Sequence, residues 1–137
     1  MMKQLIIIVL IAAITTSATA QKDREKIESL RIAHITNKLD FSSEESQAFW
    51  PIFNTYEASK HNLRDEKRTL IRESKEGVNV IDELIRIEEA QYLLFKQYMT
   101  DLRDVLSDDQ ILSLLSAEKK FKERLIKRLH SDRAGEN

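Results

Sequence analysis

This chain of 137 residues contains no cysteine, only two glycines and a single proline. Without cysteine it has no disulfide framework, no thiolate nucleophile and no sulfur ligand for a metal ion. Sheet proteins with many tight turns use more glycine and proline, so their scarcity favours a few long helices. The two isolated glycines also exclude the glycine-rich loops that bind phosphate groups.

An excess of one charge is also missing, because 22 Lys and Arg residues stand against 23 Asp and Glu residues. This balance argues against a nucleic-acid-binding protein. The sequence has no G-x-S-x-G motif and no grouping of Ser, His and an acidic residue at a strand-to-helix turn. We therefore expect a protein that acts by binding, not an enzyme, and we expect no cofactor.

The only long apolar run lies at the start of the chain. Lys3 precedes a run over 5–14, and small residues follow up to Ala18-Thr19-Ala20. This is the pattern of a signal peptide over 1–20, cleaved after Ala20, and the run is too short to span a bilayer comfortably. The alternative is a retained amphiphilic anchor. We expect an exported, periplasmic chain over 21–137 that forms one domain with no stable membrane span.

One short segment occurs twice, sixty-five positions apart, as Phe41–Glu45 and Leu106–Gln110. Each copy has an apolar residue, a Ser, two polar residues and then Glu or Gln. Ser42 and Ser107 fit helix N-caps, and Glu45 and Gln110 fit the residues that complete a capping box. Leu106 can also pack on the residue five positions later, Ile111, whereas Phe41 has Ser46 at that place. A duplicated helix start predicts a duplicated helical hairpin.

Apolar residues at helical spacing predict four long helices, and hence an all-α fold of two hairpins. The expected ranges are about 23–39, 43–75, 79–106 and 108–130, with a polar, frayed tail over 131–137. Gly77 falls in the expected loop over 74–80. Pro51 predicts a kink near Trp50, or alternatively a break into two helices. The third helix carries the broadest predicted apolar stripe, made of Ile81, Leu84, Ile85, Leu94, Phe95, Tyr98, Met99, Leu102, Val105 and Leu106.

Helices of this length would reach roughly 40 Å in a short chain, which leaves a thin core. Apolar positions near the helix ends would stay poorly covered. The pattern therefore predicts association with a second copy or with another partner, and a homodimer is the expected state.

The two capping segments resemble the LTxxQ motifs of the Spy/CpxP group of periplasmic proteins. The copy at Leu106–Gln110 matches with Ser in place of Thr, whereas the copy at Phe41–Glu45 departs at its apolar position and ends in Glu. The stretch over Phe49–Tyr56 is similar to a segment in a branch described as sensors of extracytoplasmic-function sigma factors. The resemblance covers nearly all of the chain after residue 20. Its motifs are structural caps, so they identify a fold better than an activity.

The resemblance implies a curved four-helix protomer in a cradle-like antiparallel dimer. It implies an envelope-stress adaptor or ATP-independent chaperone. Such a protein would bind unfolded client proteins, or it would bind an envelope sensor or anti-sigma protein as its partner. The alternative that it implies is a metal-responsive periplasmic sensor of the ZraP or CnrX type. A purely structural envelope protein is a third possibility.

Three features are candidates for function. His61 shares a helix face with Glu57 and Asp65, and His34 lies on an apolar face, so either could bind a metal, although a solvated stripe and a packed histidine are the simpler interpretations. The aromatic cluster around Trp50 spans more than one helix face, so Trp50 is a candidate for an interface or a concave surface. The fourth helix offers a candidate binding surface of Lys119, Lys120 and Arg124, together with Lys122, Lys127 and Arg128.

The fourth helix has two interpretations. It is a solvated face whose charges pair as Glu118–Lys122 and Glu123–Lys127, or an electropositive surface that captures acidic or unfolded partners by salt-sensitive contacts.

Overall fold

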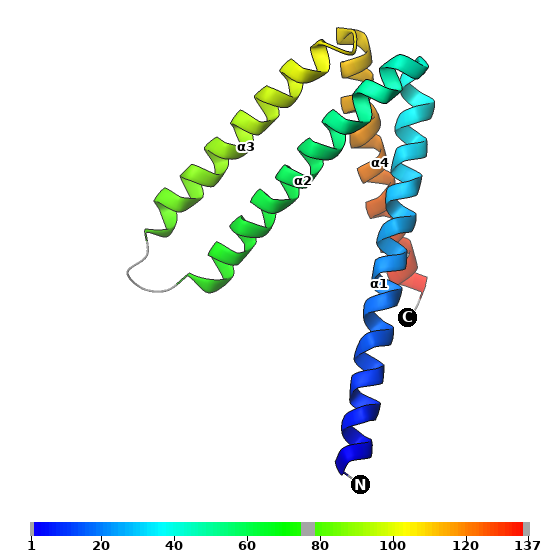
Figure 1. Ribbon diagram of the computed structural model, residues 1–137, viewed down its shortest axis with the longest axis vertical. Coiled ribbons are helices and arrows are strands. Elements are labelled where there is room, and N and C mark those ends of the chain that lie inside the picture. Colours follow the sequence, from blue (N-terminus) through cyan, green and yellow to red (C-terminus); the bar gives the residue numbers. More distant parts are fainter. Residues whose placement is uncertain (1, 75–78, 136–137) are drawn as a thin grey trace. The chain divides into compact units, whose positions relative to one another are not determined.

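The computed structural model describes residues 2–74 and 79–135, with side chains from residue 18 onward. Over these residues the chain forms four helices and no strand (Figure 1). The helices are α1 (Met2–Leu39), α2 (Ser43–Glu73), α3 (Val80–Arg103) and α4 (Asp108–Gly135). The predicted all-α class with four long helices is therefore confirmed.

The first helix begins much earlier than its predicted start near residue 23. α1 runs without interruption from Met2, since residues 2–20 contain neither Gly nor Pro to break a helix. Because a signal peptide is itself helical, a helix over residues 2–20 agrees equally with a signal peptide and with a retained segment. Cleavage after Ala20 therefore stays a prediction. α1 ends at Leu39, as predicted, and the next residue, Asp40, adopts the left-handed backbone conformation with φ 49°. Asp tolerates this conformation better than most residues, which suits the end of a helix.

Two predicted boundaries in the middle of the chain need adjustment. α2 continues through Pro51 as one helix, so the alternative of two separate helices is wrong, while a bend at Pro51 stays a prediction. α3 ends at Arg103 instead of Leu106, because the chain tightens there into a turn, with i→i−3 hydrogen bonds from the Asp104 N–H to the Asp101 carbonyl at 3.3 Å and from the Val105 N–H to the Leu102 carbonyl at 3.0 Å. Residues 75–78, including Gly77, lie outside the described residues.

The last helix extends past its predicted end. α4 continues to Gly135, beyond its predicted end near His130, and the expectation of a frayed tail stays a prediction. Residues 131–135 are exposed but include helix formers such as Arg133 and Ala134, and no helix breaker interrupts them before Gly135.

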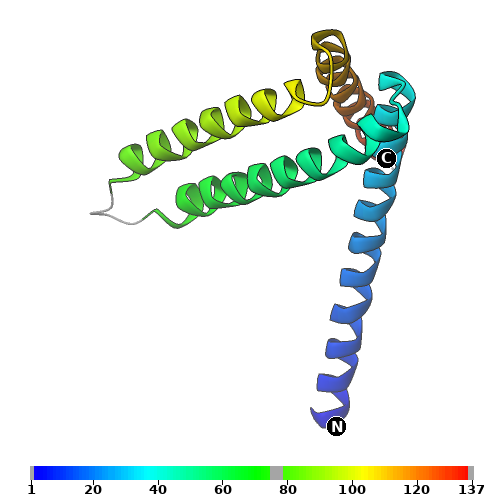
Figure 2. The same cartoon turned by 45° about the horizontal axis from the view of Figure 1, so that its top comes forward.

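The chain divides into two compact units, and the expected single domain over 21–137 stays a prediction. Unit 1 comprises Met1–Asp40 and Leu114–Asn137, and unit 2 comprises Phe41–Ser113. Within unit 2, α2 and α3 lie side by side as an antiparallel hairpin, as both ribbon views show (Figure 1, Figure 2). Within unit 1, α1 runs antiparallel to the part of α4 that begins at Leu114. No helix that the described residues form is long and apolar enough to cross a membrane.

The core is small and made of apolar side chains. Its fully buried members include Phe49 and Phe53 of α2 and Ile87 and Leu102 of α3. The predicted stripe of α3 was wrong in part, since it omitted Ile87 and included three side chains that the structure leaves exposed. The exposed members of that predicted stripe are Ile81, Ile85 and Phe95. α3 therefore has one apolar face that packs against α2 and a second that is left open.

Candidate functional site

Both predicted capping boxes are present. Ser42 Oγ accepts a hydrogen bond from the Glu45 N–H at 3.0 Å, and the Glu45 carboxylate accepts from the Ser42 N–H at 3.0 Å. At the start of α4, Ser107 Oγ accepts from the Gln110 N–H at 3.2 Å, and Gln110 Oε1 accepts from the Ser107 N–H at 2.9 Å. Each box satisfies two backbone donors that a helix start leaves without an intrahelical partner. These two serines therefore have a structural role.

The two boxes also contact each other. Gln110 Nε2 donates to Glu45 Oε2 at 3.0 Å in a partly buried position, so the same carboxylate oxygen accepts from the Ser42 N–H and from Gln110. This contact explains why the second copy of the motif ends in Gln. A second Glu would bring two carboxylates together, whereas the amide supplies a donor. The repeat in the sequence predicted two boxes but gave no sign that they meet.

The aromatic residues at the start of α2 form a cluster inside unit 2. Phe41 packs on Phe49 with ring centroids 4.7 Å apart, which gives Phe41 a partner although Ser46 offers none. Trp50 lies edge-on to Phe49 at 4.9 Å and to Phe53 at 5.4 Å. Phe49 and Phe53 are buried, whereas Phe41 and Trp50 are half-buried. Trp50 is thus largely engaged by its own chain, with one part left accessible.

The hairpin of α2 and α3 is closed by aromatic and charged pairs. The rings of Tyr56 and Tyr98 stack with centroids 3.9 Å apart and planes 3° apart. Toward the far end of the hairpin, Lys67 pairs with Glu88, and Arg86 pairs with both Glu66 and Glu83. The Arg86 guanidinium donates hydrogen bonds to the Glu83 and Glu66 carboxylates, and these bonds, first that to Glu83 and then that to Glu66, raise its pKa above its ordinary value.

A groove of about 320 Å³ lies along the hairpin. Its lining is mainly apolar, from Pro51, Ile52, Tyr56, Leu94 and Tyr98, with Thr55, Gln97 and Asp101 at its polar positions. Gln97 donates to the Asp101 carboxylate at 2.7 Å, so the acidic residue already has a partner.

The cations of α4 behave differently from those of the hairpin. Six of them form a group that we call the α4 basic face: Lys119, Lys120, Lys122, Arg124, Lys127 and Arg128. The expected pairs Glu118–Lys122 and Glu123–Lys127 are not formed: Glu118 instead holds Arg31 of α1 through both carboxylate oxygens, with Nε to Oε1 at 2.9 Å. Among the described residues, no member of the basic face has an ion pair. All six side chains of the α4 basic face are exposed.

Exposed apolar side chains accompany the α4 basic face. They recur at helical spacing along the same helix, so Lys119 and Lys122 fall between apolar neighbours above and below them. The exposed apolar members are Leu112, Leu115, Ile126 and Leu129, with 39% exposure for Leu115 and 63% for Leu112. The predicted binding residues Lys119, Lys120 and Arg124 thus lie together on α4 in unit 1, while Trp50 belongs to unit 2.

The two candidate histidines occupy different surroundings. His34 packs on Phe121 of α4 with ring centroids 5.9 Å apart, and its buried Nε2 has no hydrogen-bond partner within the described part of the chain. His61 is exposed and contacts Asp65 at 3.0 Å, while Glu57 pairs with Lys60. Nowhere in residues 18–74 and 79–135 do three His, Asp or Glu side chains group in a way that could hold a metal ion.

Comparisons with protein-family models, curated proteins and solved structures find no match to this chain.

Proposed function

We propose that this protein is an exported envelope-stress adaptor or ATP-independent chaperone, which acts by binding unfolded proteins or a sensor or anti-sigma partner. The observation that carries the proposal is the α4 basic face, with six cations that have no ion pair in the described chain and exposed apolar side chains beside them on the same helix. Unpaired charge beside open apolar surface suits a partner that brings both acidic and apolar residues.

Physical chemistry assigns the two kinds of side chain different parts in binding. Cations without an ion-pair partner attract an acidic chain at a distance and raise its association rate. Added salt lowers this rate because it screens the charges. Exposed leucine and isoleucine side chains then contribute stability as they leave water, at about 25 cal/mol for each Å² buried. An unfolded chain exposes more apolar side chains of this kind than a folded acidic protein does. The proposed site therefore favours unfolded acidic clients over folded ones.

A homodimer belongs to the same proposal. The open face of α3 exposes Ile81, Ile85, Tyr92, Leu93 and Phe95 over the length of the helix. Contiguous apolar surface of this kind marks an interaction site in a soluble protein. A second copy would remove it from water without using the α4 basic face.

The proposal is tested by measuring aggregation of an unfolded acidic client, without nucleotide, in the presence of the mature chain and its variants. We expect the triple reversal Lys119→Glu, Lys120→Glu and Arg124→Glu to weaken protection, and added salt to weaken it in the unchanged protein. The matched control reverses Lys22, Arg24 and Lys26, which are also exposed and change the net charge equally. Equal protection by both triple variants would contradict the proposal.

The metal-sensor alternative is separated by the same assay. It predicts that protection or melting temperature responds to Zn²⁺, and that His34→Ala or His61→Ala removes this response. Our proposal predicts that both histidine variants capture the client as the unchanged protein does, with and without Zn²⁺.

A further inference from the structure

One side of α4 carries a row of exposed apolar and cationic side chains within unit 1. Its members recur at alternating steps of four and three residues, so they lie above one another along the helix. Leu115, Ile126 and Leu129 are 39%, 43% and 49% exposed. From first to last the row extends about 27 Å, at a rise of 1.5 Å per residue. We call it the α4 mixed row, and it consists of Leu115, Lys119, Lys122, Ile126, Leu129 and Arg133.

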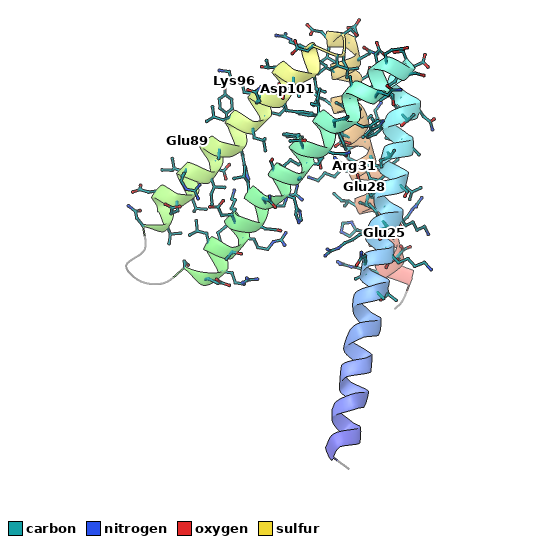
Figure 3. All side chains as sticks on the ribbon, in the orientation of Figure 1. Glu25, Glu28, Arg31, Glu89, Lys96 and Asp101 are labelled. Carbon is teal, nitrogen blue, oxygen red and sulfur yellow. The ribbon has the colours of Figure 1, made fainter. Side chains whose placement is uncertain are left out.

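The charge around the α4 mixed row is almost entirely positive. Residues 119–131 include the six cations of the α4 basic face and a single carboxylate, Glu123, which gives a formal net charge of +5 with the histidine neutral, in a chain whose net charge is −1. Glu118, which could offset these cations, binds Arg31 of α1 instead, and Arg31 and its neighbour Glu28 are labelled in Figure 3. This part of the helix is therefore a local source of positive potential.

A bilayer with anionic headgroups suits this combination of side chains. A helix that lies in the plane of a membrane buries its apolar side chains about 5–10 Å deep, at the boundary between headgroups and acyl chains, while its cations contact phosphate groups. Lys119 and Lys122 suit that depth, because a lysine stem packs in apolar surroundings while its ammonium group reaches the headgroups. The basic face also extends around the helix beyond the row, and mobile headgroups can follow it there, whereas a folded protein presents one fixed surface.

We propose that α4 lies on the surface of a bilayer that contains anionic phospholipids, with the α4 mixed row toward the acyl chains. The contact is interfacial, since none of the helices in the described ranges could span a bilayer. Each Lys or Arg near such a surface strengthens binding about fivefold, and the partly covered Leu and Ile side chains add to it. The inference goes beyond the proposed function, because the ligand is a lipid surface instead of an unfolded protein.

Co-sedimentation with vesicles measures the contribution of charge. Vesicles of phosphatidylcholine with about one third phosphatidylglycerol are compared with vesicles of phosphatidylcholine alone, using the protein in the form that cells produce. Lys122→Glu with Lys127→Glu should lower the partition coefficient on charged vesicles at least about twentyfold. The matched control is Arg64→Glu with Lys96→Glu in the α2–α3 hairpin, where both cations are exposed. An equal loss in the two double variants would overturn the proposal.

A matched pair of isoleucines measures the apolar contribution. Ile126→Ser should lower the partition coefficient on charged vesicles about fivefold, because less apolar surface leaves water. Ile71→Ser in α2 is the control, since Ile71 is 56% exposed and lies outside α4, and it should leave binding unchanged. Both side chains are largely exposed, so circular dichroism should show the same helix content in each variant. Unchanged binding by Ile126→Ser would indicate a purely electrostatic contact and overturn the proposal.

A tryptophan reporter tests which side of α4 meets the lipid. Trp50→Phe removes the single natural tryptophan, and Leu129→Trp then places a reporter in the α4 mixed row. Its emission should move to shorter wavelength on charged vesicles, and brominated acyl chains should quench it. Ser131→Trp in the same background is the control, because two residues correspond to about 200° around a helix. Equal quenching at the two positions, or none at position 129, would overturn the proposed orientation.

The outcomes separate this inference from the proposed function. Binding to charged vesicles without protection of the unfolded client supports the lipid contact and overturns the client-binding function. Protection of the client without binding to charged vesicles overturns the inference and supports the proposed function. If the protein does both, charged vesicles should reduce protection, because lipid and client use the same helix. Equal binding to charged and uncharged vesicles would overturn the role of the anionic headgroups, and with it the inference.

Discussion

The α2–α3 hairpin and the second half of α4 use similar residues in opposite ways. In the hairpin, Lys67 and Arg86 hold carboxylates of the facing helix or of their own, and the inner face buries Phe53 and Ile87. In α4, the basic face has no ion pair within the described chain, and Ile126 and Leu129 are exposed. In the hairpin, Lys67 and Arg86 are thus engaged in ion pairs, although α3 also leaves one apolar face open. α4 leaves cations and apolar groups free for another molecule, and this difference locates the proposed binding surface.

The largest effect should come from removing a side chain that the hairpin buries. Phe53→Ala leaves a cavity and should lower the free energy of unfolding by about 3–5 kcal/mol. Leu129→Ala in α4 is the control, because that side chain is 49% exposed and little contact is lost. Urea denaturation followed by circular dichroism measures both. Similar losses in the two variants would remove the distinction between the two regions.

The next effect should come from the one strong ion pair that α4 does make. Arg31 and Glu118 have side chains only 16% and 24% exposed, so Glu118→Ala should cost about 1–3 kcal/mol by leaving a largely buried guanidinium poorly matched. Arg31 keeps a longer contact with Glu28 at 3.8 Å, which moderates the loss. Glu123→Ala removes an exposed carboxylate of the same helix and should change little. If neither Glu118→Ala nor Glu123→Ala lowered the free energy of unfolding, the stability of unit 1 would not depend on the pair of Arg31 and Glu118.

Loss of a helix cap should have a smaller effect. Ser107→Ala removes the acceptor for the Gln110 N–H and should cost about 1 kcal/mol. Gln110→Glu keeps the box but places a carboxylate against Glu45, so it should destabilise at neutral pH. The deficit should shrink in high salt, because salt screens the repulsion between the two carboxylates. Thermal melts in low and high salt measure this difference, and a deficit that does not depend on salt would contradict the contact between the boxes.

The smallest effect is expected for the exposed pairs across the hairpin. Lys67 and Glu88 are 38% and 55% exposed, so Lys67→Ala should cost about 0.5 kcal/mol or less and the loss should vanish in high salt. Ser74, at the end of α2, donates a long hydrogen bond of 3.4 Å to the Ile71 carbonyl, so Ser74→Ala is a control that removes no charge. A loss above about 1.5 kcal/mol would show that the pair is far better shielded from water than its exposure indicates.

Local signals in the sequence determined the helices themselves. Scarcity of Gly and Pro, apolar spacing and the twin segments at Ser42 and Ser107 were enough to predict an all-α chain and the start of α2 and α4, because capping depends on residues within one turn. Helix ends were less well predicted. α3 stops three residues short of Leu106, and α4 continues past His130, because propensity alone marks neither end sharply.

Only the tertiary structure decided which side chains meet. Periodicity cannot distinguish Ile87, which is fully buried, from Ile81, which is 64% exposed, since α3 has two apolar faces and one neighbour. Nor could spacing show that Glu118 turns to Arg31, 87 residues away, or that Gln110 bonds to Glu45, 65 residues away. A helix is specified by contacts between near neighbours in the chain, whereas its partner is specified by contacts that form only when distant segments pack together.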